Sequence, residues 1–210
     1  MSYYSNNILE DVHNYGASLS SREIFLHNMF STSDEGNPGV DYRMASVFIK
    51  NLRMLENKSQ DPIIIHMNSI GGCWSDGISI YDAIQMSKCY ISIMVYGQAE
   101  SMSSIILQAA DERIMCPNAY FMLHYGSSDA SGDYQSNQNW IQYEKNICDT
   151  MLDIYSNMCV RSKFAKEKYS KPDVNKIKNF LNKKLKEGDW YLTPQQTIYY
   201  GFADKIVGLE

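Results

Sequence analysis

Short apolar runs alternate along this chain with segments that repeat apolar residues at helical spacing. The run PIIIHMN (62–68) is rich in β-branched residues and lacks polar alternation, which predicts a strand buried on both faces, and ISIMVY (91–96) predicts a second buried strand. Each run leads into a helical pattern, at 75–86 and at 101–110. Because parallel strands need crossover connections, this order predicts an α/β fold with a mostly parallel sheet.

Other segments extend the same pattern. Between 40 and 56, apolar residues recur at intervals of three and four, which predicts an amphipathic helix. The polar segment 126–139 predicts a loop, and TPQQTIYYG (193–201) has the Thr-Pro start and glycine end of a short helix. The remaining expected elements are strands at 22–27, 112–116 and 119–124, helices at about 140–164 and 174–187, and a final strand within 202–208.

The length of 210 residues suits one domain, which we expect at 22–210 behind an N-terminal arm at 1–21. The net charge of −5 argues against a general nucleic-acid binder, because such proteins carry a basic surface. The dense basic stretch KIKNFLNKKLKEGD (176–189) has apolar residues at helical spacing, so we interpret it as a solvated helix face.

The chain start, MSYYSNNILEDVHNYG, lacks the basic and apolar regions of a signal peptide, and no apolar run approaches the length of a membrane span. The five cysteines are scattered, odd in number and form no CxxC pair. A disulfide framework or zinc site is therefore not expected, and reduced thiols in a cytoplasmic protein are the simpler account. We expect no metal, no cofactor, no membrane partner and no nucleic-acid partner.

Three stretches with possible chemistry follow predicted strands: SIGG (69–72), GQAES (97–101) and His124. In parallel α/β sheets, sites form at the carboxyl ends of strands, where loops lead into helices. Each stretch also has an ordinary explanation, because an N-cap serine, a Gly-Gly turn and a structural histidine are all common. The same is true of Asp189, which alone would be interpreted as a cap.

Together these stretches supply every group that nucleophilic acyl transfer needs. A serine hydroxyl is a weak nucleophile, so a neutral imidazole must take its proton, and a carboxylate must hold the imidazole in the right tautomer. A bare glycine backbone can present an N–H group to a developing oxyanion. The combination therefore favours a hydrolytic site over four unrelated structural residues.

Several blocks occur in one order across most of residues 22–208. They are IIIHMNSIGG (63–72), DGISIYDAIQ (76–85), YGQAESMSSIILQAA (96–110), PNAYFMLHYG (117–126) and GDWYLTPQQTIYYGFADKIVG (188–208). In this order the chain resembles the ClpP family of serine peptidases, the proteolytic subunits of the Clp protease, within the wider ClpP/crotonase fold. The G-Q-A-x-S-M block, combined with P-N followed by five residues and histidine, is the most specific part.

The resemblance implies the roles of individual residues. Ser101 would be the nucleophile, His124 the general base and Asp189 the orienting acid. Gly72 and Met102 would donate backbone N–H groups to the oxyanion.

The resemblance also implies an assembly. Residues of about 125–172 would form a protruding handle, with a strand and a long helix through which two rings dock. The chain would be one subunit of a homo-oligomeric barrel of stacked rings, supplied with unfolded protein by an ATP-driven unfoldase. A GxxxxGK[ST] motif is absent from the sequence, so the ATPase step would belong to that partner.

The sequence departs from the family pattern at three places. Glu100 replaces the small residue usual before the nucleophile, and it could pair with a neighbouring subunit, face solvent or disfavour the oxyanion. NSIGG (68–72) replaces the usual NSPGG, which could loosen the turn that aims the Gly72 N–H. His124 and Asp189 are separated by more residues than the family leads us to expect, and we place the extra length in 126–139 and 163–173.

Two other functions stay open from the sequence. A pseudo-protease subunit could keep the triad residues in a misaligned site and act only through assembly, which Glu100 and the long insertion would allow. A crotonase-like acyl-CoA enzyme could use the same fold, but it does not explain why Ser101, His124 and Asp189 occur together. The high content of Met, Tyr and Asn suggests a divergent member of the family, and a phage-encoded copy is one hypothesis.

Overall fold

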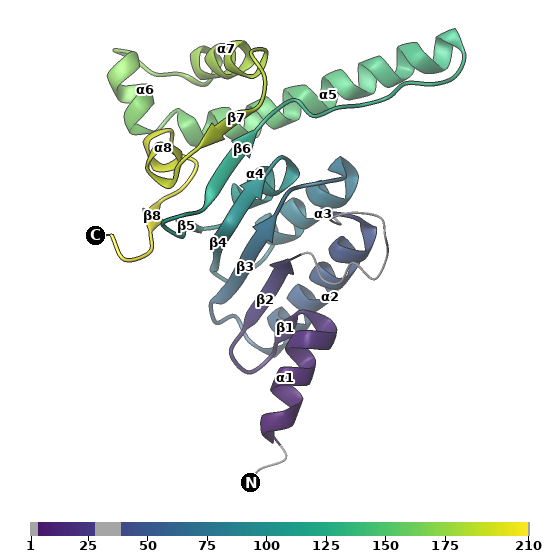
Figure 1. Cartoon of the computed structure of the whole chain (residues 1–210), viewed down its shortest axis with the longest axis vertical. Helices are drawn as coiled ribbons and strands as arrows, with labels where there is room; N and C mark the ends of the chain where they lie inside the picture. Colours follow the sequence, from purple (N-terminus) through teal and green to yellow (C-terminus); the bar gives the residue numbers. More distant parts are fainter. Residues whose placement is uncertain (1–3, 28–38, 210) are drawn as a thin grey trace.

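The computed structural model describes residues 4–27 and 39–209. Its helices are α1 (Tyr4–Tyr15), α2 (Tyr42–Lys58), α3 (Trp74–Gln85), α4 (Met102–Leu107), α5 (Tyr134–Cys159), α6 (Lys163–Lys168), α7 (Val174–Leu185) and α8 (Pro194–Tyr199). Its strands are β1 (Ala17–Ser18), β2 (Glu23–His27), β3 (Ile63–Ser69), β4 (Ile91–Glu100), β5 (Glu112–Met115), β6 (Tyr120–Leu123), β7 (Trp190–Leu192) and β8 (Lys205–Ile206). These elements confirm the predicted α/β fold (Figure 1).

The sheet has the order β1-β2-β3-β4-β5-β8 and is parallel from β2 to β8. Strand β4 has two neighbours on one side, because its first half pairs with β5 and its last residues, Gln98–Glu100, pair with β6. Strand β7 then pairs antiparallel with β6. This arrangement brings the carboxyl ends of β3, β4 and β6 close together at one edge of the sheet.

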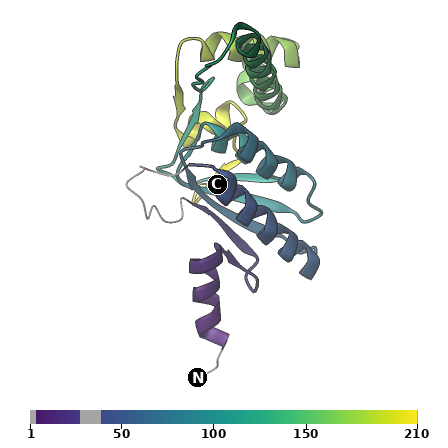
Figure 2. The same ribbon diagram turned by 90° about the vertical axis from the view of Figure 1, so that its right-hand side faces the viewer.

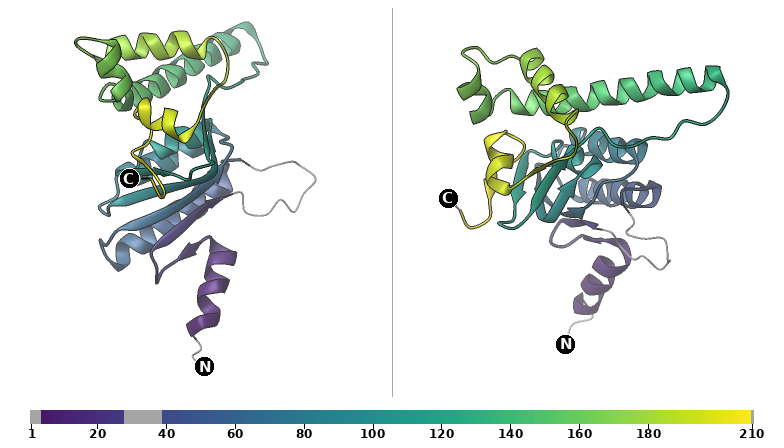
Figure 3. Two further views of the ribbon diagram at one scale, coloured as in Figure 1. Left: turned by 60° about the vertical axis from the view of Figure 1, so that its left-hand side comes forward. Right: turned by 45° about the horizontal axis from the view of Figure 1, so that its top comes forward.

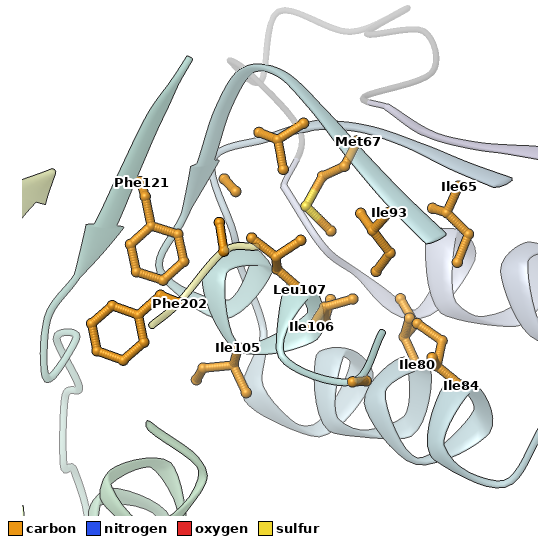
Figure 4. Packing of buried hydrophobic residues seen from close by; sticks show 14 of the residues in the cluster. Ile65, Met67, Ile80, Ile84, Ile93, Ile105, Ile106, Leu107, Phe121 and Phe202 are labelled. Atoms are coloured by element: carbon orange, nitrogen blue, oxygen red, sulfur yellow. The ribbon is translucent and has the colours of Figure 1, made fainter. Parts of the chain in front are cut away.

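Helices α2, α3 and α4 cover one face of the sheet (Figure 2). Their apolar side chains pack against those of β3 and β4, as Figure 4 shows for Ile65, Met67 and Ile93 facing Ile80 and Ile106. All five side chains are fully buried, and burying one such side chain stabilises the fold by about 1.5–3 kcal/mol. The core therefore fixes the strand ends from which the site is built.

The two central strands are buried on one face only, so our prediction of full burial was wrong. Ile63, Ile65 and Met67 of β3 are buried, whereas Ile64 is 37% exposed and His66 is half-buried. Strand β4 alternates in the same way over its first half. The sequence of β3 conceals this alternation because its outward-facing residues include an isoleucine.

A second layer of helices lies beyond the carboxyl ends of the strands. Helix α5 begins at Tyr134 rather than near Trp140, so the predicted loop is shorter than 126–139. The side chain of Asp133 accepts a hydrogen bond from the Ser136 amide and caps this helix. The first half of α5 extends well past the other elements (Figure 3), as expected of a handle, but the described residues 124–133 contain no strand.

The N-terminal region contains a helix that the sequence did not predict. Helix α1 covers Tyr4–Tyr15 and leads into the short strand β1, which pairs antiparallel with β2. Residues 1–3 of the expected arm and the segment 28–38 lie outside the described residues. Among the helices that the structure describes, none has the length and apolar character needed to cross a membrane.

Candidate active site

Ser101 sits at a sharp turn between β4 and α4 with φ 52° and ψ −125°, a backbone conformation that is uncommon for a residue other than glycine. The surrounding backbone holds this conformation in place. The Ser101 amide donates to the Met122 carbonyl at 3.0 Å, and the Ser101 carbonyl accepts from the Ser104 amide at 3.0 Å. Strained backbone of this kind is often found at functional sites, where the surrounding structure maintains it.

The Ser101 hydroxyl does not cap helix α4. Its oxygen lies 2.7 Å from Nε2 of His124, at the end of β6. On the other side of the ring, His124 Nδ1 lies 3.2 Å from Oδ1 of Asp189, which directly precedes β7. The structure thus brings together three residues that are 23 and 65 positions apart in the sequence. The contact between His124 and Asp189 is long for a charge-assisted hydrogen bond, and the Asp189 side chain is 54% exposed.

The Asp189 loop is held by an aromatic cluster that the sequence did not reveal. Trp190 packs edge-on against Phe180 of α7 and against Tyr200, with ring centroids 6.1 and 4.7 Å apart. Beside His124, the Tyr125 hydroxyl donates to Asn182 of α7 at 2.9 Å. Helix α7 therefore contacts Tyr125, which follows His124, and Trp190, which follows Asp189. It does so although 65 positions separate His124 from Asp189.

The glycine loop after β3 lies against the Ser101 turn. A Cβ atom added to Gly71, which has φ 88°, would lie 2.6 Å from the Ser101 Cβ and 2.7 Å from the Met102 amide nitrogen. The Gly71 carbonyl and the Cys73 amide pair with Val40, so the Gly72 amide between them is not used in that pairing. The Met102 amide is the first of α4, and the first amides of a helix lack partners within it.

One cleft of about 340 Å³ connects these groups: Gly72, Ser101, Met102 and His124 all line it. The cleft is also lined by a face of α5 that the sequence did not indicate as part of the site. The residues of this face are Trp140, Tyr143, Glu144, Ile147, Cys148 and Met151. Their spacing of three and four residues is a helical stripe, but from sequence alone such a stripe cannot be distinguished from an ordinary core face.

Ser104 serves a structural purpose. Its hydroxyl donates to the Ser101 carbonyl at 2.6 Å and contacts the Tyr155 hydroxyl of α5 at 2.6 Å. Burial raises the pKa of Tyr155 far above its usual value, so the phenol stays neutral and keeps its proton. Because the Ser104 proton is donated to the Ser101 carbonyl, the Tyr155 hydroxyl is the donor in this contact. Through this contact, helix α5 is attached to the turn that carries Ser101.

Glu100 lies on β4 opposite Met122 of β6, immediately before the turn. Burial raises the pKa of the Glu100 carboxyl, the nearby His124 lowers it, and Asp189 raises it again, with a net upward shift. The carboxyl therefore interacts electrostatically with both partners of Ser101. The Glu100 side chain is therefore not fully solvated, and within the described residues it forms no direct ion pair.

Replacing Glu100 with glutamine should produce a small rise in melting temperature at pH 7 and no difference at pH 4. A carboxyl whose pKa is higher in the folded chain stabilises the fold in its protonated form, and this contribution is lost as pH rises through the folded pKa. Glutamine stays neutral at every pH and avoids the loss. Thermal unfolding at the two pH values tests this; a lower melting temperature for the variant at pH 7 would contradict it.

Comparison with known proteins identifies the family of this chain. A family model described as Clp protease matches residues 13–210. The ATP-dependent Clp protease proteolytic subunit of Carsonella ruddii (strain PV) is 30% identical over 195 residues, which cover 92% of this chain and 87% of that protein. The protein of the same name in Deinococcus radiodurans is 26% identical over 196 residues, with coverages of 92% and 83%.

A third relative, the ATP-dependent Clp protease proteolytic subunit 2 of Pseudomonas aeruginosa, is 26% identical over 197 residues and is covered to 88%. Identity is modest in all three cases, but each match extends over nearly the full length of both proteins. With the family model spanning almost all of the sequence and the fold agreeing, this chain belongs to the Clp protease family.

Proposed function

We propose that this chain is a serine endopeptidase of the ClpP type, with Ser101 as nucleophile, His124 as general base and Asp189 as the orienting acid. The observation that carries the proposal is the 2.7 Å contact between His124 Nε2 and Ser101 Oγ at a strained turn. A serine whose hydroxyl faces an imidazole nitrogen rather than a helix amide is arranged to lose its proton.

The proposed reaction follows from these positions. Ser101 Oγ attacks the carbonyl carbon of the scissile peptide while His124 Nε2 takes the hydroxyl proton, and Asp189 keeps the other ring nitrogen protonated. The Gly72 and Met102 amides donate to the oxyanion of the tetrahedral intermediate. His124 then gives the proton to the leaving amine, and a water molecule hydrolyses the acyl-enzyme by the same sequence of proton transfers.

The assembly is also part of the proposal. The curated relatives are named as proteolytic subunits of an ATP-dependent protease. We propose that this chain likewise forms a homo-oligomeric barrel of rings, with α5 as the contact between rings, and receives substrate from a separate ATP-driven unfoldase. The exposed apolar side chains Tyr134 and Ile141, on the part of α5 that extends past the other elements, support a contact surface there.

The cleft predicts a preference for apolar residues on the acyl side of the scissile bond. Met102, Ile105, Ile147 and Met151 line it beside Ser101, and Asp129 and Glu144 add two carboxyl groups. Fluorogenic peptides that end in Leu, Met or Phe should have kcat/KM values at least about tenfold above those of matched peptides ending in Asp or Glu.

The same preparation should be examined by native mass spectrometry, so that activity is assigned to an assembly of known size. Equal cleavage of apolar and acidic peptides would contradict the role of the cleft. An assembled protein that cleaves no peptide and reacts with no fluorophosphonate would favour the pseudo-protease instead. The crotonase-like function gains no support from the family match.

A further inference from the structure

Two buried serines lie between the two halves of the proposed oxyanion site. Ser103, on α4, donates from its hydroxyl to the Ser69 hydroxyl at 2.7 Å. The Ser69 hydroxyl oxygen also accepts from the Gly71 amide, at 3.3 Å. Both serine side chains are fully buried. The two hydrogen bonds therefore connect the helix that begins at Met102 with the loop that contains Gly72.

The glycine loop needs an external restraint. Gly71 and Gly72 have φ values of 88° and 150°. Glycine adopts positive and negative φ values about equally readily, so the two residues do not by themselves keep the loop in this conformation. A proline at position 70 would fix one backbone dihedral and restrict its neighbour, but this chain has Ile70 there. Hydrogen bonds from neighbouring segments can hold such a loop instead.

Val40 supplies part of this restraint. Its amide donates to the Gly71 carbonyl at 2.6 Å, and its carbonyl accepts from the Cys73 amide at 2.8 Å. These bonds fix the loop to the segment that precedes α2. They leave the spacing between the loop and α4 to other contacts. The Ser103–Ser69 hydrogen bond joins α4 to the end of β3, and the Ser69 hydroxyl in turn holds the Gly71 amide of the loop.

The spacing matters because the loop already lies in close contact with the Ser101 turn. The position where a Cβ of Gly71 would lie is only 2.7 Å from the Met102 amide nitrogen, so the loop packs directly on the peptide group that precedes α4. A shift of the loop would move the Gly72 amide relative to the Met102 amide. Misplacing a catalytic group by about 1 Å can cost on the order of 10²-fold in rate.

We infer that Ser103 and Ser69 are positioning residues that set the distance between the Gly72 and Met102 amides. Their hydrogen bond provides the restraint that a proline at position 70 would otherwise provide. The inference rests on the proposed function, because only an oxyanion makes that distance important for rate.

The test is a double-mutant cycle of Ser103→Ala and Ser69→Ala, with Ser156→Ala as the matched control. Ser156 is equally buried, and its hydroxyl bonds to the Leu152 carbonyl within α5, away from the loop. Each single variant should lower kcat about tenfold with little change in KM, less than the roughly 10²–10³-fold cost of losing an oxyanion donor. The double variant should be no worse than Ser69→Ala, because Ser69→Ala already removes the hydrogen bond to Ser103 together with the one from the Gly71 amide.

A second measurement does not depend on catalysis. Hydrogen–deuterium exchange in the peptide that spans residues 69–73 should be faster in Ser103→Ala than in the wild-type protein or Ser156→Ala. Additive losses in kcat, an effect on KM alone, or unchanged exchange would overturn the inference. If the wild-type protein hydrolyses no peptide, the proposed function fails, and the exchange comparison still decides whether Ser103 holds the loop.

Discussion

Replacing Ser101 with alanine is expected to abolish fluorophosphonate labelling and to lower kcat for peptide hydrolysis by on the order of 10⁶-fold, as the loss of the nucleophile does in other Ser-His-Asp sites. The proposed oxyanion donors and the cleft would remain, but the Ser101 hydroxyl beside His124 Nε2, which is proposed to form the acyl-enzyme, would be lost. The measurements are intact mass after labelling and hydrolysis of a fluorogenic peptide with an apolar residue at the cleavage position.

The variant should keep its fold, because alanine occupies the same backbone conformation at about the same cost as serine. Circular dichroism and native mass spectrometry should therefore match those of the wild-type protein. Ser79→Ala is the matched control, since the partner of the Ser79 hydroxyl among the described residues is the Asp76 carbonyl of its own helix. Full hydrolysis by Ser101→Ala, or labelling at another residue, would remove Ser101 from the mechanism.

Replacing Asp189 with asparagine is expected to lower kcat by on the order of 10⁴-fold, the cost of the corresponding change in trypsin. The amide NH₂ group of asparagine can donate to His124 Nδ1, which favours the tautomer with its proton on Nε2. In that tautomer the ring nitrogen facing Ser101, 2.7 Å away, cannot accept the hydroxyl proton. Steady-state hydrolysis and the rate of fluorophosphonate labelling should fall together.

The control for this variant removes a neighbouring carboxylate that does not contact the imidazole. Glu187 lies two residues before Asp189 and pairs with Lys184 at 2.8 Å on the surface. Glu187→Gln should keep kcat within about twofold of the wild-type value, because exposed ion pairs contribute little. If Asp189→Asn kept full activity, the half-exposed carboxylate would have no part in orienting His124, and the site would act as a Ser-His pair.

Most of the sheet could be predicted because its signals are local. The apolar runs of β3 and β4 and the periodic apolar residues of α2 and α3 occur within single windows of the sequence. Helix α5 was misplaced at its start because Asp133, its N-cap, lies in a polar stretch that resembles a loop. The one-sided burial of β3 was missed because its exposed residue Ile64 is apolar, and an apolar residue in a strand pattern predicts burial.

The site was partly predictable for the same reason. Ser101, His124 and the glycine loop each follow a strand, and parallel strands place their carboxyl ends at one edge of the sheet. Asp189 follows no strand of the parallel sheet and was assigned by resemblance to the ClpP family alone. The hydroxyl contact between Ser103 and Ser69 could not be predicted, because the two residues are 34 positions apart and neither is distinctive by itself.

The sequence by itself determined most of the central strands and helices, their order along the chain and the candidate residues for hydrolytic chemistry, because each of these depends on neighbours in the chain. Only the tertiary structure decided which candidates meet. Strand β6 pairs with the last residues of β4, so His124 lies beside Ser101, and the antiparallel pairing of β7 with β6 brings Asp189 back to His124 across 65 residues. Those pairings depend on hydrogen bonds and packing between distant segments, which no local pattern specifies.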